Sequence, residues 1–174
     1  MPETTTIRFR VQPGFAAVTA ILAACGWSMH TIAVGGGHWT LGPVSFSAIF
    51  TVALLALIAV HEASHVVAGR LQGQRLIGVR IGSKFGVTML GDHTPRSMLL
   101  TVASGPLIGS AAAVTVLAAT DPWSPIWAAA LVALIENLAN VGLFFLPGSD
   151  GSKIVAALKE MGADAATNQE PAAT

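Results

Sequence analysis

Four long segments of this 174-residue chain are apolar and nearly free of charge, and they constrain its fold more than any other feature. A helix needs about 20 mostly apolar residues to cross the hydrocarbon core of a bilayer. Only 10% of the residues are charged, whereas soluble domains carry roughly 25%. The sequence therefore predicts an all-α integral membrane protein with transmembrane helices over residues 14–34, 44–68, 97–119 and 125–146.

We expect one membrane domain over residues 14–162. A cytoplasmic N-terminal segment (1–13) precedes it, and a small, polar, disordered tail (163–174) follows it. With four spans, the N-terminus, the 70–96 segment and the C-terminus lie on one side of the membrane. All nine basic residues fall on that side: Arg8, Arg10, Arg70, Arg75, Arg80, Lys84, Arg96, Lys153 and Lys159. The positive-inside rule then places both termini in the cytoplasm.

The 70–96 segment is too polar to be a span. Two short apolar runs, 76–81 and 85–90, flank the turn residues Gly82-Ser83-Lys84. This pattern predicts a short β-hairpin associated with the membrane; a plain amphipathic loop is the alternative. The net charge of the chain is zero, which gives no basic field for binding nucleic acid.

The second apolar segment ends in His61-Glu62-Ala63-Ser64-His65. Ionisable side chains inside a span are costly and are therefore functional candidates. Residues four apart share a helix face, so the two histidines can bind one Zn²⁺. Glu62 is placed to act as a general base toward water.

A catalytic zinc site needs a third protein ligand. The fourth span returns to the cytoplasmic side, where Pro147 and Gly148 break the helix and Asp150 follows. Asp150 should therefore lie at the depth of the two histidines. Its alternative role is that of an N-cap for a helix over residues 151–159. A multi-cysteine metal site is excluded because Cys25 is the single cysteine.

The residues around these positions resemble the site-2 protease family of intramembrane zinc metalloproteases. Three motifs occur in the family's order: His61-Glu62-Ala63-Ser64-His65, then Gly105-Pro106, then Asn137 followed by Pro147-Gly148-Ser149-Asp150-Gly151. The likeness extends over roughly residues 44–160. It implies three core helices with one extra N-terminal span.

The resemblance also implies chemistry and partners. Zn²⁺ would be the cofactor, with Glu62 as the catalytic residue and three ligands: His61, His65 and Asp150. Substrate binding would involve Asn137, Gly105 and Pro106. The substrate would be a transmembrane segment of another protein, cleaved in or near the lipid bilayer during regulated intramembrane proteolysis. We expect an integral protein of a bacterial or archaeal cell membrane, with a membrane protein complex as a further partner.

The chain departs from the family pattern at two glycines. Gly142 and Gly109 stand where family members commonly carry asparagine. One alternative function is therefore a catalytically silent membrane subunit or adaptor that keeps the protease fold. A small ion transporter is a second alternative, although one polar cluster at one membrane face leaves its path incomplete.

Overall fold

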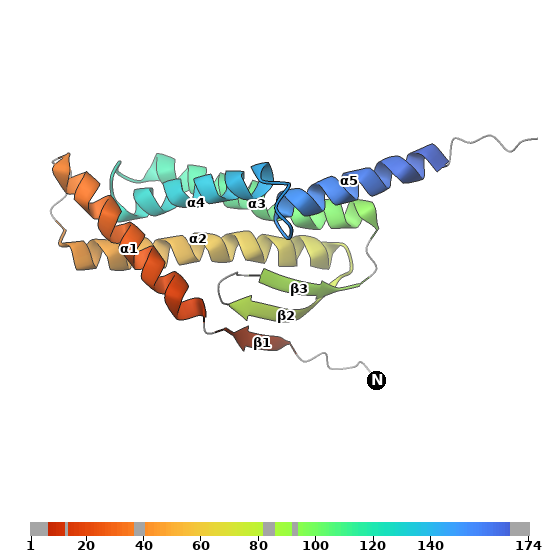
Figure 1. Ribbon diagram of the computed structural model, residues 1–174, viewed down its shortest axis with the longest axis horizontal. Coiled ribbons are helices and arrows are strands. Elements are labelled where there is room, and N and C mark those ends of the chain that lie inside the picture. The colour runs from red at the N-terminus through yellow and green to blue at the C-terminus, as the bar shows by residue number, and fades with distance from the viewer. Residues whose placement is uncertain (1–6, 13, 37–40, 82–85, 92–93, 168–174) are drawn as a thin grey trace, which may run out of the picture.

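The computed structural model describes residues 7–12, 14–36, 41–81, 86–91 and 94–167 (Figure 1). The helices are α1 (Gly14–Gly35), α2 (Pro43–Leu71), α3 (Pro95–Ala119), α4 (Pro125–Gly142) and α5 (Asp150–Thr167). The strands are β1 (Arg8–Val11), β2 (Arg75–Ile81) and β3 (Gly86–Leu90). Helices α1 to α4 are long and apolar enough to cross a membrane by length and composition. The four predicted apolar helices are confirmed in this sense.

Three of these helices begin with the same local chemistry. Proline occupies the first turn of α2, α3 and α4, where its missing N–H costs nothing. In α3 the Thr94 side chain accepts a hydrogen bond from the Ser97 N–H at 3.1 Å. In α4 the Ser124 side chain accepts one from the Trp127 N–H at 3.0 Å. Both side chains satisfy N–H groups that the helix leaves without partners.

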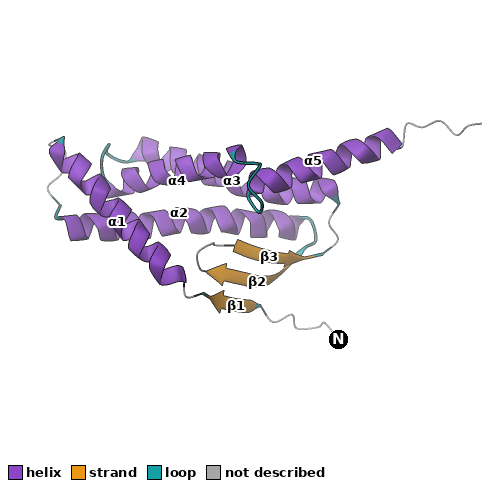
Figure 2. Ribbon diagram, in the orientation of Figure 1, coloured by secondary structure: helices purple, strands orange, loops and turns teal. Residues whose placement is uncertain are grey.

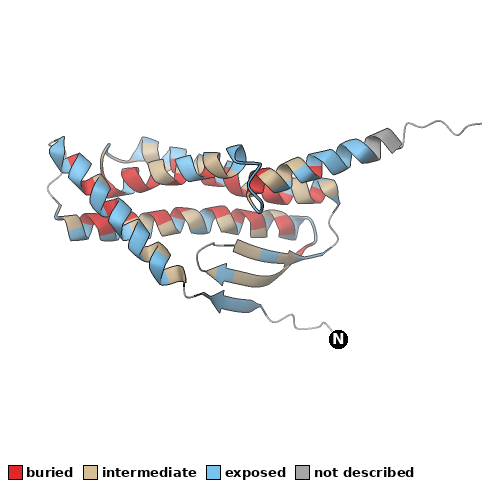
Figure 3. Ribbon diagram, in the orientation of Figure 1, coloured by how far each residue is buried: buried red, intermediate tan, exposed pale blue. Residues whose placement is uncertain are grey.

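The interior of the bundle combines bulky residues of α2 with small residues of α4. Phe46, Phe50 and Leu54 are the largest fully buried side chains. They form one buried cluster with four alanines of α4: Ala128, Ala129, Ala130 and Ala133. Small residues let apolar helices approach closely. Figure 3 shows buried residues along α2, α3 and α4, and mostly exposed residues along α1.

Helix α4 is shorter than predicted. It ends at Gly142 rather than near residue 146, because the chain turns from Leu143 onward. Gly148 has φ +85°, a conformation that favours glycine. The Ser149 hydroxyl donates to the Leu146 carbonyl at 2.9 Å and accepts from the Ser152 N–H at 3.1 Å. Ser149 therefore caps α5, and Asp150 is the first residue of that helix.

Helix α5 is longer than predicted. It continues to Thr167, so residues 163–167 are helical and the predicted disordered tail is wrong there. This stretch is rich in alanine, the best helix former. Residues 168–174 lie outside the described part. Figure 1 shows α5 starting beside α3 and extending beyond the bundle.

The predicted β-hairpin is confirmed and belongs to a larger sheet. Strands β2 and β3 pair antiparallel, and the predicted turn at Gly82-Ser83-Lys84 falls outside the described residues. Strand β1, from the segment preceding α1, pairs parallel to β2 and gives the order β1-β2-β3 (Figure 2). The prediction of an all-α protein with one hairpin was therefore incomplete, because it did not include β1. Two parallel strands are joined by a long connection and not by a tight turn, so the sequence between them contains no turn motif that would reveal the pairing.

Candidate metal centre

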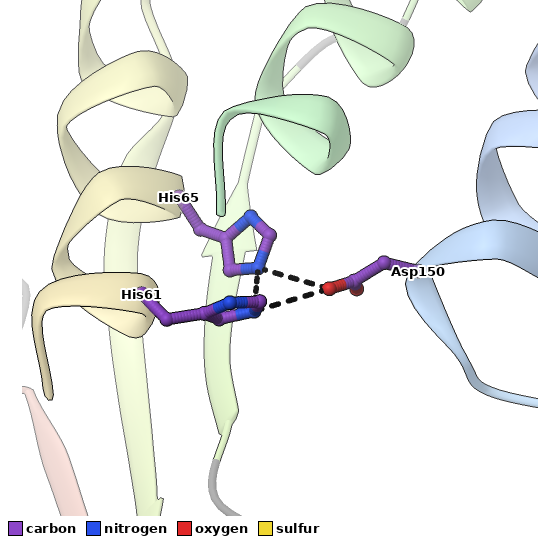
Figure 4. Close-up of side chains that lie close together, drawn as sticks. All are labelled: His61, His65 and Asp150. Atoms are coloured by element: carbon purple, nitrogen blue, oxygen red, sulfur yellow. Dashed lines mark hydrogen bonds and ion pairs between the residues drawn. The ribbon is translucent and has the colours of Figure 1, made fainter. Parts of the chain in front are cut away.

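The two histidines of α2 and the first residue of α5 meet at one point (Figure 4). The Nε2 atoms of His61 and His65 are 3.1 Å apart. Oδ2 of Asp150 lies 3.1 Å from Nε2 of His61 and 3.4 Å from Nε2 of His65. All three residues are at least 90% buried, with exposed fractions of 9%, 8% and 5%. The structure thus brings together the three predicted ligands from two distant stretches of the chain.

The second nitrogen of each imidazole fixes the ring tautomer. Nδ1 of His65 lies 2.8 Å from the Thr101 carbonyl oxygen, which can only accept, so this nitrogen carries the proton. Nδ1 of His61 lies 2.5 Å from the side-chain oxygen of Asn137 and donates in the same way. In a neutral imidazole the other nitrogen then bears a lone pair. When both rings are neutral, both Nε2 lone pairs therefore point into the centre, and a ring that is protonated at Nε2 donates there instead.

Three electron-rich atoms within 3.4 Å of one another require positive charge between them. Burial alone would raise the pKa of Asp150, but hydrogen bonds from His61 and His65 outweigh it and hold this pKa well below its ordinary range. A proton on an imidazole Nε2 supplies such a bond in the metal-free centre. A cation bound by all three atoms would satisfy the same requirement.

The geometry also fits zinc. Zinc–nitrogen and zinc–oxygen bonds of about 2.0–2.1 Å at tetrahedral angles place neighbouring ligand atoms about 3.3–3.4 Å apart. The measured separations are 3.1, 3.1 and 3.4 Å. Gly105 of α3 leaves the necessary space, because an added Cβ would collide with His65 and lie 2.9 Å from Nε2 of His61.

A second set of contacts orients the carboxylate. The Asn140 amide donates to Oδ2 of Asp150 at 2.7 Å, and its oxygen accepts from the Asp150 backbone N–H at 3.1 Å. Lys153 donates to Oδ1 at 3.3 Å. Asn140 thus ties the end of α4 to the first residue of α5. Outer contacts of this kind fix a ligand's orientation and tune its affinity for metal.

The resemblance indicated Asn137 as a site residue, and in the structure Asn140 also contacts a candidate ligand. Each is a polar residue in an apolar helix, and that was the available signal. The contribution of Thr101 is a backbone carbonyl, which leaves no mark in the sequence. The carboxylate of Asp150 faces the histidines, while the capping role considered for it belongs to Ser149.

A cavity of about 840 Å³ lies beside the centre. Its wall includes the three ligand residues and Glu62, which is half-buried. Glu136 of α4 and Val87 of β3 line the same cavity. Three carboxyl groups and two imidazoles thus border one space, whose volume is within the usual range of ligand pockets.

Two of the three predicted substrate-binding residues, Asn137 and Gly105, lie against the imidazoles. Asn137 is buried and contacts His61. Gly105 lies against both rings, and Pro106 is buried next to it inside α3. Their contact with substrate stays a prediction.

Comparisons of the chain with protein-family models, with curated proteins and with solved structures find no match. The function is therefore inferred from the residues of the centre and its surroundings.

Proposed function

We propose that this protein is an intramembrane zinc metalloprotease that resembles the site-2 protease family. The convergence of His61, His65 and Asp150 carries the proposal. Two lone pairs and a carboxylate oxygen, each oriented by a contact from another helix, form a ligand set that zinc favours. Glu62 lies one residue after the first ligand and lines the adjoining cavity.

Peptide hydrolysis at this site needs a nucleophile, a base and a positioned carbonyl. Zinc, when bound, would lower the pKa of water toward ~7 and polarise the scissile carbonyl. Glu62 would accept the proton of the attacking water and deliver it to the leaving amine. Asn137 and the Thr101 carbonyl would hold the two imidazoles in the ligating tautomer throughout.

The proposed substrate is a transmembrane segment of another protein. The four long apolar helices support insertion in a bilayer. The nine basic residues, all on one side of the predicted topology, favour a cytoplasmic location for both termini. A substrate helix must unwind before hydrolysis, because its backbone groups are bonded within the helix. Strand β3 is an edge of the sheet and contributes Gly86, Val87 and Met89 to the cavity wall. Its edge could hold the unwound strand through backbone hydrogen bonds.

A catalytically silent subunit is the second candidate. Gly142 offers no side chain at the position where the family commonly carries asparagine, and no described atom lies within 4 Å of a Cβ built there. Such a subunit would retain the metal centre and lack hydrolysis.

Metal content and hydrolysis measured on the same samples test the proposal. The full chain is purified in detergent as wild type, Glu62→Gln and Asp150→Ala. Glu160→Gln and Asp121→Ala serve as matched controls at exposed positions. Zinc is quantified by elemental mass spectrometry, and cleavage of a library of synthetic transmembrane peptides is followed by mass spectrometry.

We expect zinc in the wild type, in Glu62→Gln and in both controls, and its loss in Asp150→Ala. Cleavage should occur in the wild type and the controls only. Zinc binding without cleavage of any peptide in the wild type favours the silent subunit. Full zinc content in Asp150→Ala contradicts the metal centre itself.

A further inference from the structure

The small sheet has two chemically different faces. Residues paired across neighbouring strands point to the same face, and residues two apart on one strand do so as well. The register therefore assigns an apolar set to one side, called here the inner face: Phe9, Val11, Val79, Ile81, Val87 and Met89. The opposite side, called the outer face, carries Arg8, Arg10, Arg80, Thr88 and Leu90.

The bundle covers the inner face at β3 and β2. A Cβ built at Gly69 of α2 would lie 2.8 Å from the terminal methyl of Met89, so the inner face of β3 packs against α2. Val79 and Val87 are half-buried, whereas Arg80 and Thr88 on the outer face are exposed. Burial thus alternates from Val87 to Leu90 on β3 and from Val79 to Ile81 on β2, as expected for a sheet that rests on a helix.

This cover ends at β1, the strand farthest from α2 (Figure 1). Phe9 and Val11 belong to the inner face, yet 71% and 66% of their surfaces are exposed. The neighbouring Ile7 is 41% exposed. One edge of an otherwise covered apolar face therefore extends past the bundle.

Three observations indicate what covers this edge. Val11 lies three residues before the start of α1, the first helix that is apolar enough to enter a membrane. Around β1, Arg8, Arg10 and Arg80 occupy the opposite face, so apolar and cationic groups are segregated at this edge of the sheet, as in elements that lie at a membrane surface. The exposed set is two side chains of one short strand and the residue before it, far below the roughly 800 Å² per partner of a stable protein interface.

We propose that β1 is embedded in the lipid surface, with Phe9 and Val11 among the acyl chains at the headgroup boundary and Arg8 and Arg10 among hydrated headgroups. The basic outer face suits a leaflet that contains anionic lipid. This inference rests on the membrane insertion proposed above, although not on proteolysis.

Site-directed fluorescence on the full chain tests the inference. Four single-cysteine variants, Arg8→Cys, Phe9→Cys, Arg10→Cys and Val11→Cys, are made in a Cys25→Ala background. Each is labelled with bimane and reconstituted in vesicles of phosphatidylcholine and phosphatidylglycerol. Quenching is measured with a phospholipid spin-labelled near the top of its acyl chain and, separately, with aqueous iodide. Val52→Cys reports insertion, because Val52 is 69% exposed on the most apolar helix.

The expected result is an alternation along β1. Labels at positions 9 and 11 are quenched more strongly by lipid than those at 8 and 10, and iodide gives the reverse order. Quenching of all four by iodide alone, with the position-52 label quenched by lipid, overturns the inference while leaving insertion intact. Protection of 9 and 11 from both quenchers indicates a protein cover and also overturns it. A position-52 label that lipid does not quench shows instead that the proposed insertion has failed.

Discussion

Gly105 of α3 lies where any larger residue would fill the metal centre. An added Cβ would be 2.9 Å from Nε2 of His61 and closer still to the His65 ring, whereas ordinary contact begins near 3.4 Å. The His61 ring would therefore have to retreat by about 0.5 Å and the His65 ring further. Zinc–ligand distances tolerate deviations of about 0.2 Å. Gly105→Ala should consequently remove at least one imidazole from the ligand set.

We expect the zinc affinity of Gly105→Ala to fall by at least about 100-fold, the upper end of the effect of losing an outer contact to a ligand. This loss corresponds to about 2.7 kcal/mol. Competition between the purified protein and a fluorescent zinc chelator measures it. Gly142→Ala is the matched control, since the space around its added Cβ is open among the described atoms. Its affinity should equal that of the wild type.

A second, milder substitution keeps this test informative if Gly105→Ala does not fold. Overpacking can cost about 1–3 kcal/mol of stability, so Gly105→Ala is useful only if its circular dichroism matches the wild type. Gly109→Ala is milder, because its Cβ would lie 3.0 Å from the Asn137 amide and 3.2 Å from Nδ1 of His61. We expect a loss of about 10-fold there. Wild-type affinity in a folded Gly105→Ala would show that the imidazoles do not converge beside α3.

Three further predictions concern the same centre. Asn140→Ala removes both contacts to Asp150 and should lower zinc affinity by about 10–100-fold in the chelator titration; an unchanged affinity would deny Asn140 its orienting role. Gly151→Ala would press a methyl group into the Val141 carbonyl and displace the start of α5, so zinc affinity and the thermal midpoint should both fall. Gly162→Ala, in open surroundings on the same helix, should change neither adversely, and it gains up to about 1 kcal/mol from helix propensity. Protons compete with metal for both Nε2 atoms, so zinc affinity should decrease as the pH is lowered, and a flat pH profile would contradict imidazole ligation.

The helices could be predicted from the sequence because their signals are local. Apolar runs of span length, each bounded by glycine, proline or a capping residue, located α1 to α4 within a few residues at most boundaries. The end of α4 was misplaced because Leu143 to Leu146 is as apolar as a helix interior. The side-chain bonds of Ser149 and the left-handed Gly148 end the helix there. Such a turn depends on geometry that hydropathy does not record.

Strand β1 could not be predicted for a different physical reason. Four residues pair in parallel with a strand about 70 positions later, and the pairing depends on the fold of everything between them. The alternation of arginine with Phe9 and Val11 was visible in the sequence. However, an alternation over four residues is too short to distinguish a strand from an irregular charged segment when no partner strand lies nearby in the sequence.

The ligands of the centre were easier to predict than their supports. Helical spacing places His61 and His65 on one face, and the return of the fourth span places Asp150 at their level. The supports have no comparable rule: Thr101 acts through its backbone, and Asn140 acts across a turn of the chain. Resemblance to a family could not supply Asn140 either, because the asparagine it suggests would stand at Gly142.

The contacts behind the candidate ligands would couple a bound metal ion to the whole bundle. His61 is held by Asn137 of α4, His65 by the Thr101 carbonyl of α3, and Asp150 by Asn140 of α4. No ligand is oriented by its own helix alone, so the centre is complete only when α2 to α5 are packed together. Anything that binds the assembled state alone stabilises it, by about 2.7 kcal/mol at a free concentration of 100 times Kd. Linkage is reciprocal. A packing defect at the close contact of Gly151 with α4 should therefore weaken metal binding, even though it lies outside the ligand set. The binding free energy that is lost equals the free energy by which bound metal favours the correctly packed state over the defective one.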